Sequence, residues 1–166
     1  MITVSLVNTS KKLLLSILLT LSTILAFGQA SNASTLKPYG FAVVVSNVET
    51  STGWYQSTFG LQLRNRNDNP ERGSKIAVLA ANDFLIELIE KKSSLTQKNI
   101  LSGKPSQTLI QGFSKIGLYV ADFDACIHRL NALNVKFFGD VYTDPVSNKR
   151  SFIILDPDEN MIQIFE

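Results

Sequence analysis

The stretch Phe41-Ala-Val-Val-Val-Ser-Asn-Val-Glu49 decides the fold, because its pattern returns later in the chain. At an offset of 75 residues stands Ile116-Gly-Leu-Tyr-Val-Ala-Asp-Phe-Asp124. Each stretch is an apolar run typical of a β-strand, followed by a small residue, Asn or Asp, an apolar residue and an acid. This ending is typical of a strand that leads into a helix, with Asn47 or Asp122 as the N-cap. The sequence therefore predicts two copies of a strand–helix unit.

The two predicted helices run from Glu49 to Phe59 and from Asp124 to Leu133. In the second helix, Ile127, Leu130 and Leu133 fall on one face, as expected for a helix that packs on a sheet. A glycine follows the first helix and an asparagine the second. Both residue types commonly end helices, because they adopt left-handed backbone angles at low cost.

The later parts of the two units also match. Residues 74–90 align with residues 150–166 at an offset of 76 without a gap, and Ile-Glu-Leu-Ile-Glu lies over Ile-Gln-Ile-Phe-Glu. We therefore predict an α+β fold of two tandem βαβββ modules, at about 38–90 and 113–166. The polar stretch 91–112 is expected to be the linker between them.

Each predicted module leaves one face of its sheet uncovered by its helix. Pairing two modules would place a cleft between two curved mixed sheets. Side chains alternate between the faces of a strand, so the apolar set Ile116, Leu118 and Val120 should pack on the helix. The residues expected on the cleft face are Gly40, Ala42, Val44, Leu85, Glu87, Ile89, Lys115, Gly117, Tyr119, Met161, Gln163 and Phe165.

The N-terminal segment differs from the rest of the chain. Lys11 and Lys12 precede a 15-residue apolar run, Leu13–Phe27, and small-residue steps follow up to Ala33. This order is typical of a secretory signal, and the run is shorter than the roughly 20 residues of a membrane span. We expect residues 1–33 to be a signal peptide and residues 34–166 to be the mature domain, in the periplasm or secreted. An uncleaved membrane anchor is the alternative.

Composition narrows the class of partner. The chain has 166 residues, 45% of them hydrophobic and 18% charged, which is typical of a globular domain. A formal net charge of +2 without a basic block gives no reason to expect nucleic acid. Cys126 is the single cysteine, so no internal disulfide can form. Export without disulfides favours a bacterial envelope protein.

Two motifs resemble a known family. Residues 41–63, with V-S-N-V, W-Y and F-G-L, resemble the opening of a vicinal oxygen chelate module, the glyoxalase/bleomycin-resistance/extradiol dioxygenase superfamily. Residues 153–163, with D-P-D-E-N, resemble its closing D-P-x-G-N signature, with Glu159 in place of the usual Gly. The resemblance covers the whole expected mature chain, and it implies the paired-module fold with a small-molecule cleft.

The resemblance also implies where metal ligands would stand. Carried over position by position, they fall on Gly40, Glu87, Lys115 and Gln163, where the family usually has His and Glu. Only Glu87 is a strong ligand type, and a catalytic zinc, nickel or iron site needs three or more. We therefore expect neither a metal nor another cofactor.

Three functions follow as hypotheses. The first is a metal-free protein that binds a small molecule in the inter-sheet cleft, contacted by Tyr119 and Gln163. The second is a lyase, isomerase or dioxygenase with a remodelled centre, in which Glu87 is the general base and Lys115 the electrophile. The third is structural, with a Glu87–Lys115 ion pair that fills a former site. A homodimer is possible, and stable membrane insertion after signal removal is not expected.

The remaining conspicuous side chains are interpreted as structural. We expect surface positions for His128, Arg64 and Arg150. Core or boundary positions are expected for Cys126, Trp54 and Tyr55. Asp156 and Asn160 are expected to form a turn.

Overall fold

Both predicted strand–helix units form, with the predicted N-caps. The computed structural model describes residues 39–82 and 84–166, so the expected signal peptide 1–33 lies outside the described residues. Strand β1 (Gly40–Val45) leads into helix α2 (Val48–Phe59), and β5 (Lys115–Tyr119) leads into α4 (Phe123–Ala132). The Asn47 side chain accepts a hydrogen bond from the Thr50 amide at 2.8 Å. The Asp122 side chain accepts a hydrogen bond from the Ala125 amide at 2.9 Å.

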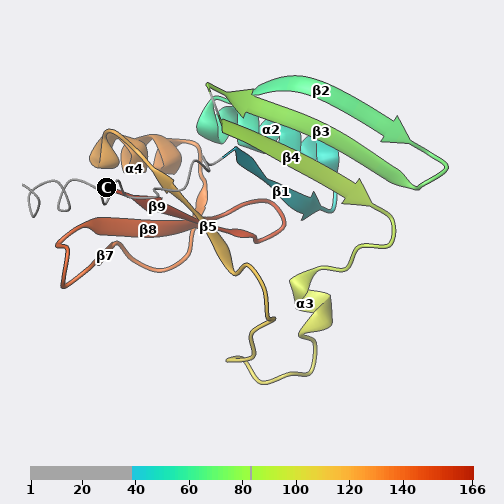
Figure 1. The fold of residues 1–166 in the computed structure, drawn as a ribbon. Coiled ribbons are helices and arrows are strands. Elements are labelled where there is room, and N and C mark those ends of the chain that lie inside the picture. The colour runs from blue at the N-terminus through green and yellow to red at the C-terminus, as the bar shows by residue number, and fades with distance from the viewer. Residues whose placement is uncertain (1–38, 83) are drawn as a thin grey trace, which may run out of the picture. The chain divides into compact units, whose positions relative to one another are not determined.

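The first module has the predicted order of elements. After α2 come β2 (Gln62–Asn69), β3 (Ser74–Ala81) and β4 (Phe84–Lys91), and the sheet order is β1-β4-β3-β2 (Figure 1). Strand β1 pairs with β4 in parallel, and the other pairs are antiparallel. The parallel pair is possible because the whole module separates the two strands in sequence.

The second module departs from the predicted three closing strands. Its sheet order is β5-β9-β8-β6, and a further strand, β7, also pairs with β8. The strand expected after the helix is broken into two short pieces separated by Gly139, whose φ of +75° is left-handed. The bounds are β6 (Lys136–Phe137), β7 (Tyr142–Thr143), β8 (Arg150–Leu155) and β9 (Met161–Phe165).

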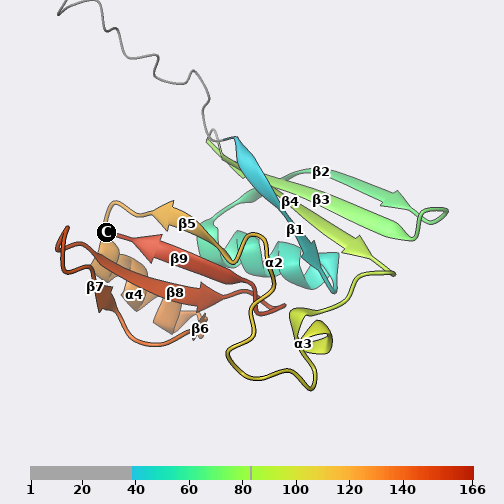
Figure 2. The same ribbon diagram turned by 60° about the horizontal axis from the view of Figure 1, so that its bottom comes forward.

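The linker is less uniform than the sequence indicated. It contains a single helical turn, α3 (Gln97–Ile100), between stretches of irregular chain (Figure 2). The Thr96 side chain caps this turn by accepting from the Asn99 amide at 3.1 Å. The prediction of an irregular linker overlooked this cap, because one Thr in a polar stretch is a weak signal.

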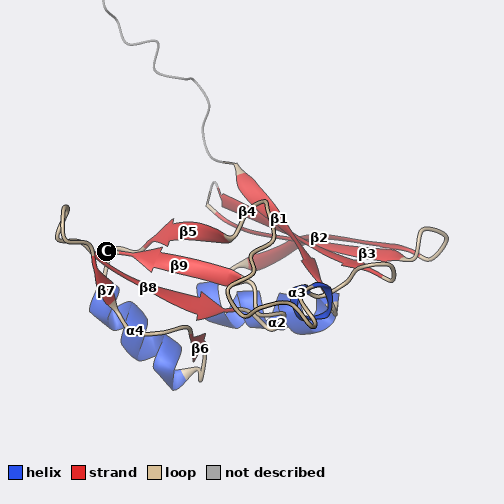
Figure 3. Cartoon of the chain, turned by 90° about the horizontal axis from the view of Figure 1, so that it is seen from below, coloured by secondary structure: helices blue, strands red, loops and turns tan. Residues whose placement is uncertain are grey.

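Burial alternates along the strands as the period-two pattern predicts. Ile86 and Leu88 are fully buried and Glu87 between them is only partly buried, while in β9 Ile162 and Ile164 are buried and Gln163 is not. In Figure 3, both α2 and α4 lie on one side of β1, β4, β5 and β9. The buried faces are therefore the helix-covered faces, and the opposite faces are open.

One detail of the second helix was predicted wrongly. Helix α4 buries Phe123, Cys126 and Leu130, whereas Leu133 is the C-cap and its side chain is 43% exposed. The apolar face therefore begins one turn earlier than the predicted set. Ile127 packs partly against this core.

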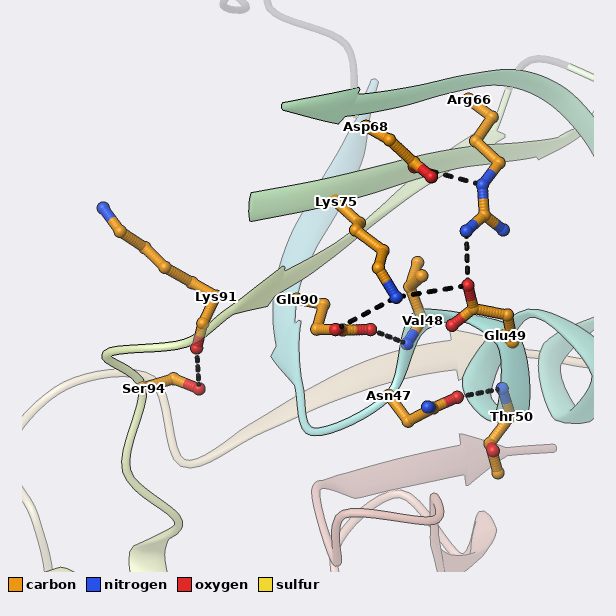
Figure 4. Close-up of polar contacts among 10 residues, drawn as sticks. All are labelled: Asn47, Val48, Glu49, Thr50, Arg66, Asp68, Lys75, Glu90, Lys91 and Ser94. Atoms are coloured by element: carbon orange, nitrogen blue, oxygen red, sulfur yellow. Dashed lines mark hydrogen bonds and ion pairs between the residues drawn. The ribbon is translucent and has the colours of Figure 1, made fainter. Parts of the chain in front are cut away.

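An ion-pair network ties each helix to its own sheet. In the first module, Lys75 Nζ lies 3.3 Å from Glu90 and 3.4 Å from Glu49, and Arg66 also pairs with Glu49 (Figure 4). The other Glu90 oxygen accepts from the Val48 amide at 2.9 Å. Hydrogen bonding to Arg66 lowers the pKa of Glu49, and hydrogen bonding to Glu90 raises the pKa of Lys75.

The second module repeats this network with a different cation. Arg150 bonds Asp124 at 2.9 Å and Glu166 at 2.8 Å. Asp124 and Glu166 stand at the offsets that align them with the two glutamates of the first network. Arg150 is therefore engaged in ion pairs within its own module, which agrees with its interpretation as a structural residue.

Residues Pro38–Glu166 form one compact unit. Within the described ranges, no helix has both the length and the hydropathy to cross a membrane.

Candidate functional site

The four positions mapped from the resemblance lie on the open sheet faces. Glu87 on β4 is the register partner of Ala42 on β1. Gln163 on β9 is the register partner of Gly117 on β5, two residues beyond Lys115. Glu87 and Gln163 are half-buried, and Lys115 is exposed.

The first of the four positions is closed to any side chain. A Cβ atom placed on Gly40 would lie 2.0 Å from the backbone oxygen of Leu85, its register partner on β4. No pair of non-bonded heavy atoms tolerates this separation, so a histidine here would require β1 to move. Glycine is needed at Gly40 because the neighbouring strand approaches so closely.

The other three positions offer a mixed set of groups. The Gln163 amide donates to Ser151 Oγ at 2.9 Å. Among the described residues, no ion pair joins Glu87 to Lys115, so the pairing that the sequence suggested is absent. No group of three or more His, Cys, Asp or Glu side chains suited to a metal occurs in the part of the chain that the structure describes.

Tyr119 lies on the open face of β5, as the alternation predicts, and its side chain is 76% exposed. Its ring packs against Phe165 with a centroid separation of 5.6 Å, and Lys149 Nζ lies 5.8 Å from its centroid. The contact with Phe165 on β9 therefore positions the Tyr119 ring on the exposed surface of the sheet.

A small cavity lies between the unpaired edges of the two sheets, and we call it the seam cavity. Its volume is about 120 Å³. It is bordered by β1 on one side and by the starts of β5 and β9 on the other. Of the four predicted site residues, Lys115 lines it, and Glu87, Tyr119 and Gln163 do not. The lining residues are Phe41, Ala42, Val43, Tyr55, Gln97, Phe113, Ser114, Lys115, Ile116, Asn160, Met161 and Ile162.

A buried hydrogen-bond network stands behind the seam cavity. Tyr55, which is fully buried on α2, donates from its hydroxyl to Asp156 Oδ2 at 3.0 Å. The Asn160 side chain donates to the same oxygen at 2.9 Å. The amides of Asp158 and Asn160 donate to Asp156 Oδ1 at 2.9 and 2.8 Å. One carboxyl group thus orders the β8–β9 turn and joins it to the helix of the first module.

Burial raises the pKa of both ionisable groups in this network. Asp156 is 4% exposed, and desolvation raises the pKa of its carboxyl group, although the four hydrogen bonds act in the opposite direction. Desolvation and the nearby Asp156 carboxylate raise the pKa of Tyr55, so its hydroxyl remains a donor.

Comparison with known proteins identifies the family. The model of the Glyoxalase/Bleomycin resistance protein/Dioxygenase superfamily matches residues 39–164. The chain belongs to this superfamily. It matches none of the curated proteins.

Several solved structures share the fold of this chain. A glyoxalase family protein from Enterococcus faecalis has a TM-score of 0.69 at 17% identity, covering 80% of this chain and 98% of that one. The fosfomycin resistance protein FosX from Listeria monocytogenes has a TM-score of 0.59 at 16% identity, with coverages of 80% and 92%. Trypanothione-dependent glyoxalase I from Leishmania major has a TM-score of 0.58 at 15% identity, with coverages of 80% and 87%.

Two larger cavities of this superfamily member lie beside α3. Their volumes are about 500 and 840 Å³. Both are lined by Ser46, Thr96, Gln97 and Asp158, and neither is lined by any of the four predicted site residues. The Asp158 side chain accepts from the Ser46 amide at 3.0 Å, which ties the β8–β9 turn to the end of β1.

Sequence reasoning found the turn but missed its partners. Asp156 and Asn160 do form the predicted turn, and Tyr55 is a core residue as interpreted. The Tyr55–Asp156 bond links residues 101 positions apart, which no local pattern reveals. The Glu159 position, where the family usually has Gly, has a left-handed φ of +66°. That backbone angle explains the family's preference for glycine.

Two other interpretations agree with the structure. His128 is exposed on α4, as expected for a surface residue. Cys126 is buried, and desolvation raises the pKa of its thiol, which keeps it protonated and unreactive.

Proposed function

We propose that this chain is an exported protein that binds a small molecule between its two sheets without the metal of its superfamily. The observation that carries the proposal is the approach of Leu85 O to Gly40, which leaves no room for the first ligand side chain. Lys115 contributes an ammonium group and Gln163 a neutral amide, so Glu87 is the only carboxylate among the four positions. One carboxylate does not fit a catalytic transition metal.

Export is part of the proposal because of the sequence alone. The basic, apolar and small-residue order before Ala33 supports a cleaved signal. The chain has a single cysteine and so no internal disulfide, which suits a bacterial envelope protein better than a small eukaryotic secreted scaffold.

The test is the metal content and ligand content of the protein. The chain is purified without chelator, its zinc, nickel, manganese and iron are measured by elemental analysis, and zinc and nickel binding is followed by calorimetry. We expect far less than one equivalent of metal and no tight site. Native mass spectrometry after exposure to a low-molecular-weight extract of the host should show a retained small molecule.

A matched variant shows that the metal assay would detect a site. Lys115→His combined with Gln163→Glu, with Glu87 retained, places three strong ligand types at the mapped positions and leaves Gly40 unchanged. This variant should gain zinc binding. One equivalent of metal in the parent chain would overturn the proposal, and a folded variant without any gain would show that the mapped positions do not converge.

A further inference from the structure

The seam cavity differs from the larger cavities in its lining. Seven of its twelve lining residues are apolar, and Lys115 is the one charged side chain among the described residues that line it. The 500 Å³ cavity, by contrast, is lined by Glu90, Asp158 and two lysines. A pocket with apolar walls and a single cation is complementary to a single negative charge on an apolar body.

The exposure of its lining residues distinguishes the inner end of the seam cavity from its mouth. Tyr55 and Ile162 are at most 1% exposed, so one side of the cavity reaches the core. The mouth is marked by the exposed lining residues, which are Ala42, Gln97, Phe113, Ser114 and Lys115. The Lys115 ammonium group therefore stands at the mouth, whereas the Tyr55 and Ile162 side chains form the inner end.

The buried Asp156 carboxyl group disfavours an anion at the inner end of the cavity. Asp156 accepts from Tyr55 and Asn160, both of which line the cavity, so a carboxyl group stands directly behind the inner side. An anionic group placed there would approach the Asp156 carboxyl group, and the hydroxyl donor of Tyr55 is already engaged. At the mouth, among the described residues, no carboxylate lies within 4.0 Å of the Lys115 ammonium group.

The volume limits the size of the ligand. An apolar cavity of about 150 Å³ accommodates benzene, which has six heavy atoms. The 120 Å³ of the seam cavity therefore accommodates about four to six heavy atoms. A longer chain would have to leave through the mouth.

We propose that the seam cavity binds a short-chain monocarboxylate, with its carboxylate at Lys115 and its alkyl chain directed toward Tyr55. This inference rests on the proposed function, because it names the ligand class and the place where the ligand lies. Ser114 and Gln97 add hydrogen-bond donors at the mouth, and Phe41, Ile116 and Met161 contact the alkyl chain.

The experiment is calorimetry on the full chain with acetate, butyrate, hexanoate and decanoate, and with butyramide as the uncharged match for butyrate. We expect the affinity to peak at butyrate or hexanoate and butyramide to bind more weakly. Lys115→Met should weaken butyrate binding about tenfold or more, through loss of a charge-assisted contact. Lys115→Arg keeps the charge and should retain most of the affinity.

A second variant tests the alkyl end of the pocket. Ala42→Ile adds methyl and methylene groups at the wall of the cavity and should shift the preference from hexanoate toward acetate. Circular dichroism and thermal melts establish that each variant is folded. An unfolded Ala42→Ile variant leaves the lysine pair as the deciding comparison.

Three results would overturn the inference: no butyrate binding at millimolar concentration, equal binding by the Lys115→Met variant, or affinity that rises steadily up to decanoate. These failures are distinct from failure of the proposed function. A stoichiometric metal in the parent chain defeats the proposed function, whatever the carboxylates do. A metal-free chain that retains another small molecule but no carboxylate defeats only this inference.

Discussion

The hydrogen bond between Tyr55 and Asp156 should contribute measurably to stability, and Tyr55→Phe removes it without changing the packing of the ring. The hydroxyl lies 3.0 Å from Asp156 Oδ2, and both residues are buried. Asp156 keeps its other three donors, so the turn should stay formed. The change therefore isolates the bond that links α2 to the β8–β9 turn.

The magnitude follows from the charge of the acceptor. A hydrogen bond to an ionised group contributes about 1.5–3 kcal/mol, and a neutral one about 0.5–1.5 kcal/mol. At neutral pH we expect the free energy of unfolding to fall by about 1.5–3 kcal/mol, which lowers Tm by roughly 5–10 °C for a domain of this size.

The effect should depend on pH in a defined direction. Burial raises the pKa of Asp156 in the folded state, so the folded chain holds this proton to higher pH than the unfolded chain does. Stability is therefore lost as pH rises from the unfolded pKa, about 3.9, through the folded pKa. Loss of the Tyr55 donor raises the pKa of Asp156 in the folded state further. The variant therefore loses more stability than the parent chain above this pH range. Below about pH 4 only a neutral hydrogen bond is lost.

Urea denaturation of the parent and the variant between acidic and neutral pH measures this difference. Tyr142→Phe is the matched control, because Tyr142 is 57% exposed and its change should stay within about 0.5 kcal/mol. A loss below about 0.5 kcal/mol for Tyr55→Phe at neutral pH, or a loss that does not shrink in acid, would refute the reasoning.

Three further predictions concern other parts of the chain. Gly40→Ala should destabilise the fold by about 1–3 kcal/mol, because its Cβ meets a strand backbone. Gly53→Ala, where a Cβ meets nothing within 4 Å, should stabilise α2 by about 0.5–1 kcal/mol. Denaturant melts of the two variants and the parent measure both changes. The Cys126 thiol should react slowly with a thiol reagent in the folded chain and rapidly in urea, because burial raises its pKa; equal rates would contradict its burial. N-terminal sequencing of protein from the host envelope should begin near Ser31 or Ser34, whereas an intact Met1 would favour the anchor.

The sequence by itself determined the division into two modules and the strand–helix start of each one. The repeat at offsets of 75 and 76 predicted two modules, and Asn47 and Asp122 predicted both helix starts. Alternation placed Glu87 and Gln163 on the faces opposite the buried residues of their strands. These features could be predicted because they depend on residues within a few positions of one another, where backbone geometry is fixed.

Tertiary structure alone decided how these parts meet. Alternation tells which face a side chain occupies but not what lies across from it, so the absence of a Glu87–Lys115 ion pair could not be read from the sequence. The contact of Tyr55 with Asp156 depends on the docking of two modules, and the tight approach at Gly40 depends on the pairing of β1 with β4. Long-range contacts of this kind are set by the packing of whole elements, whose separation in space no local pattern encodes.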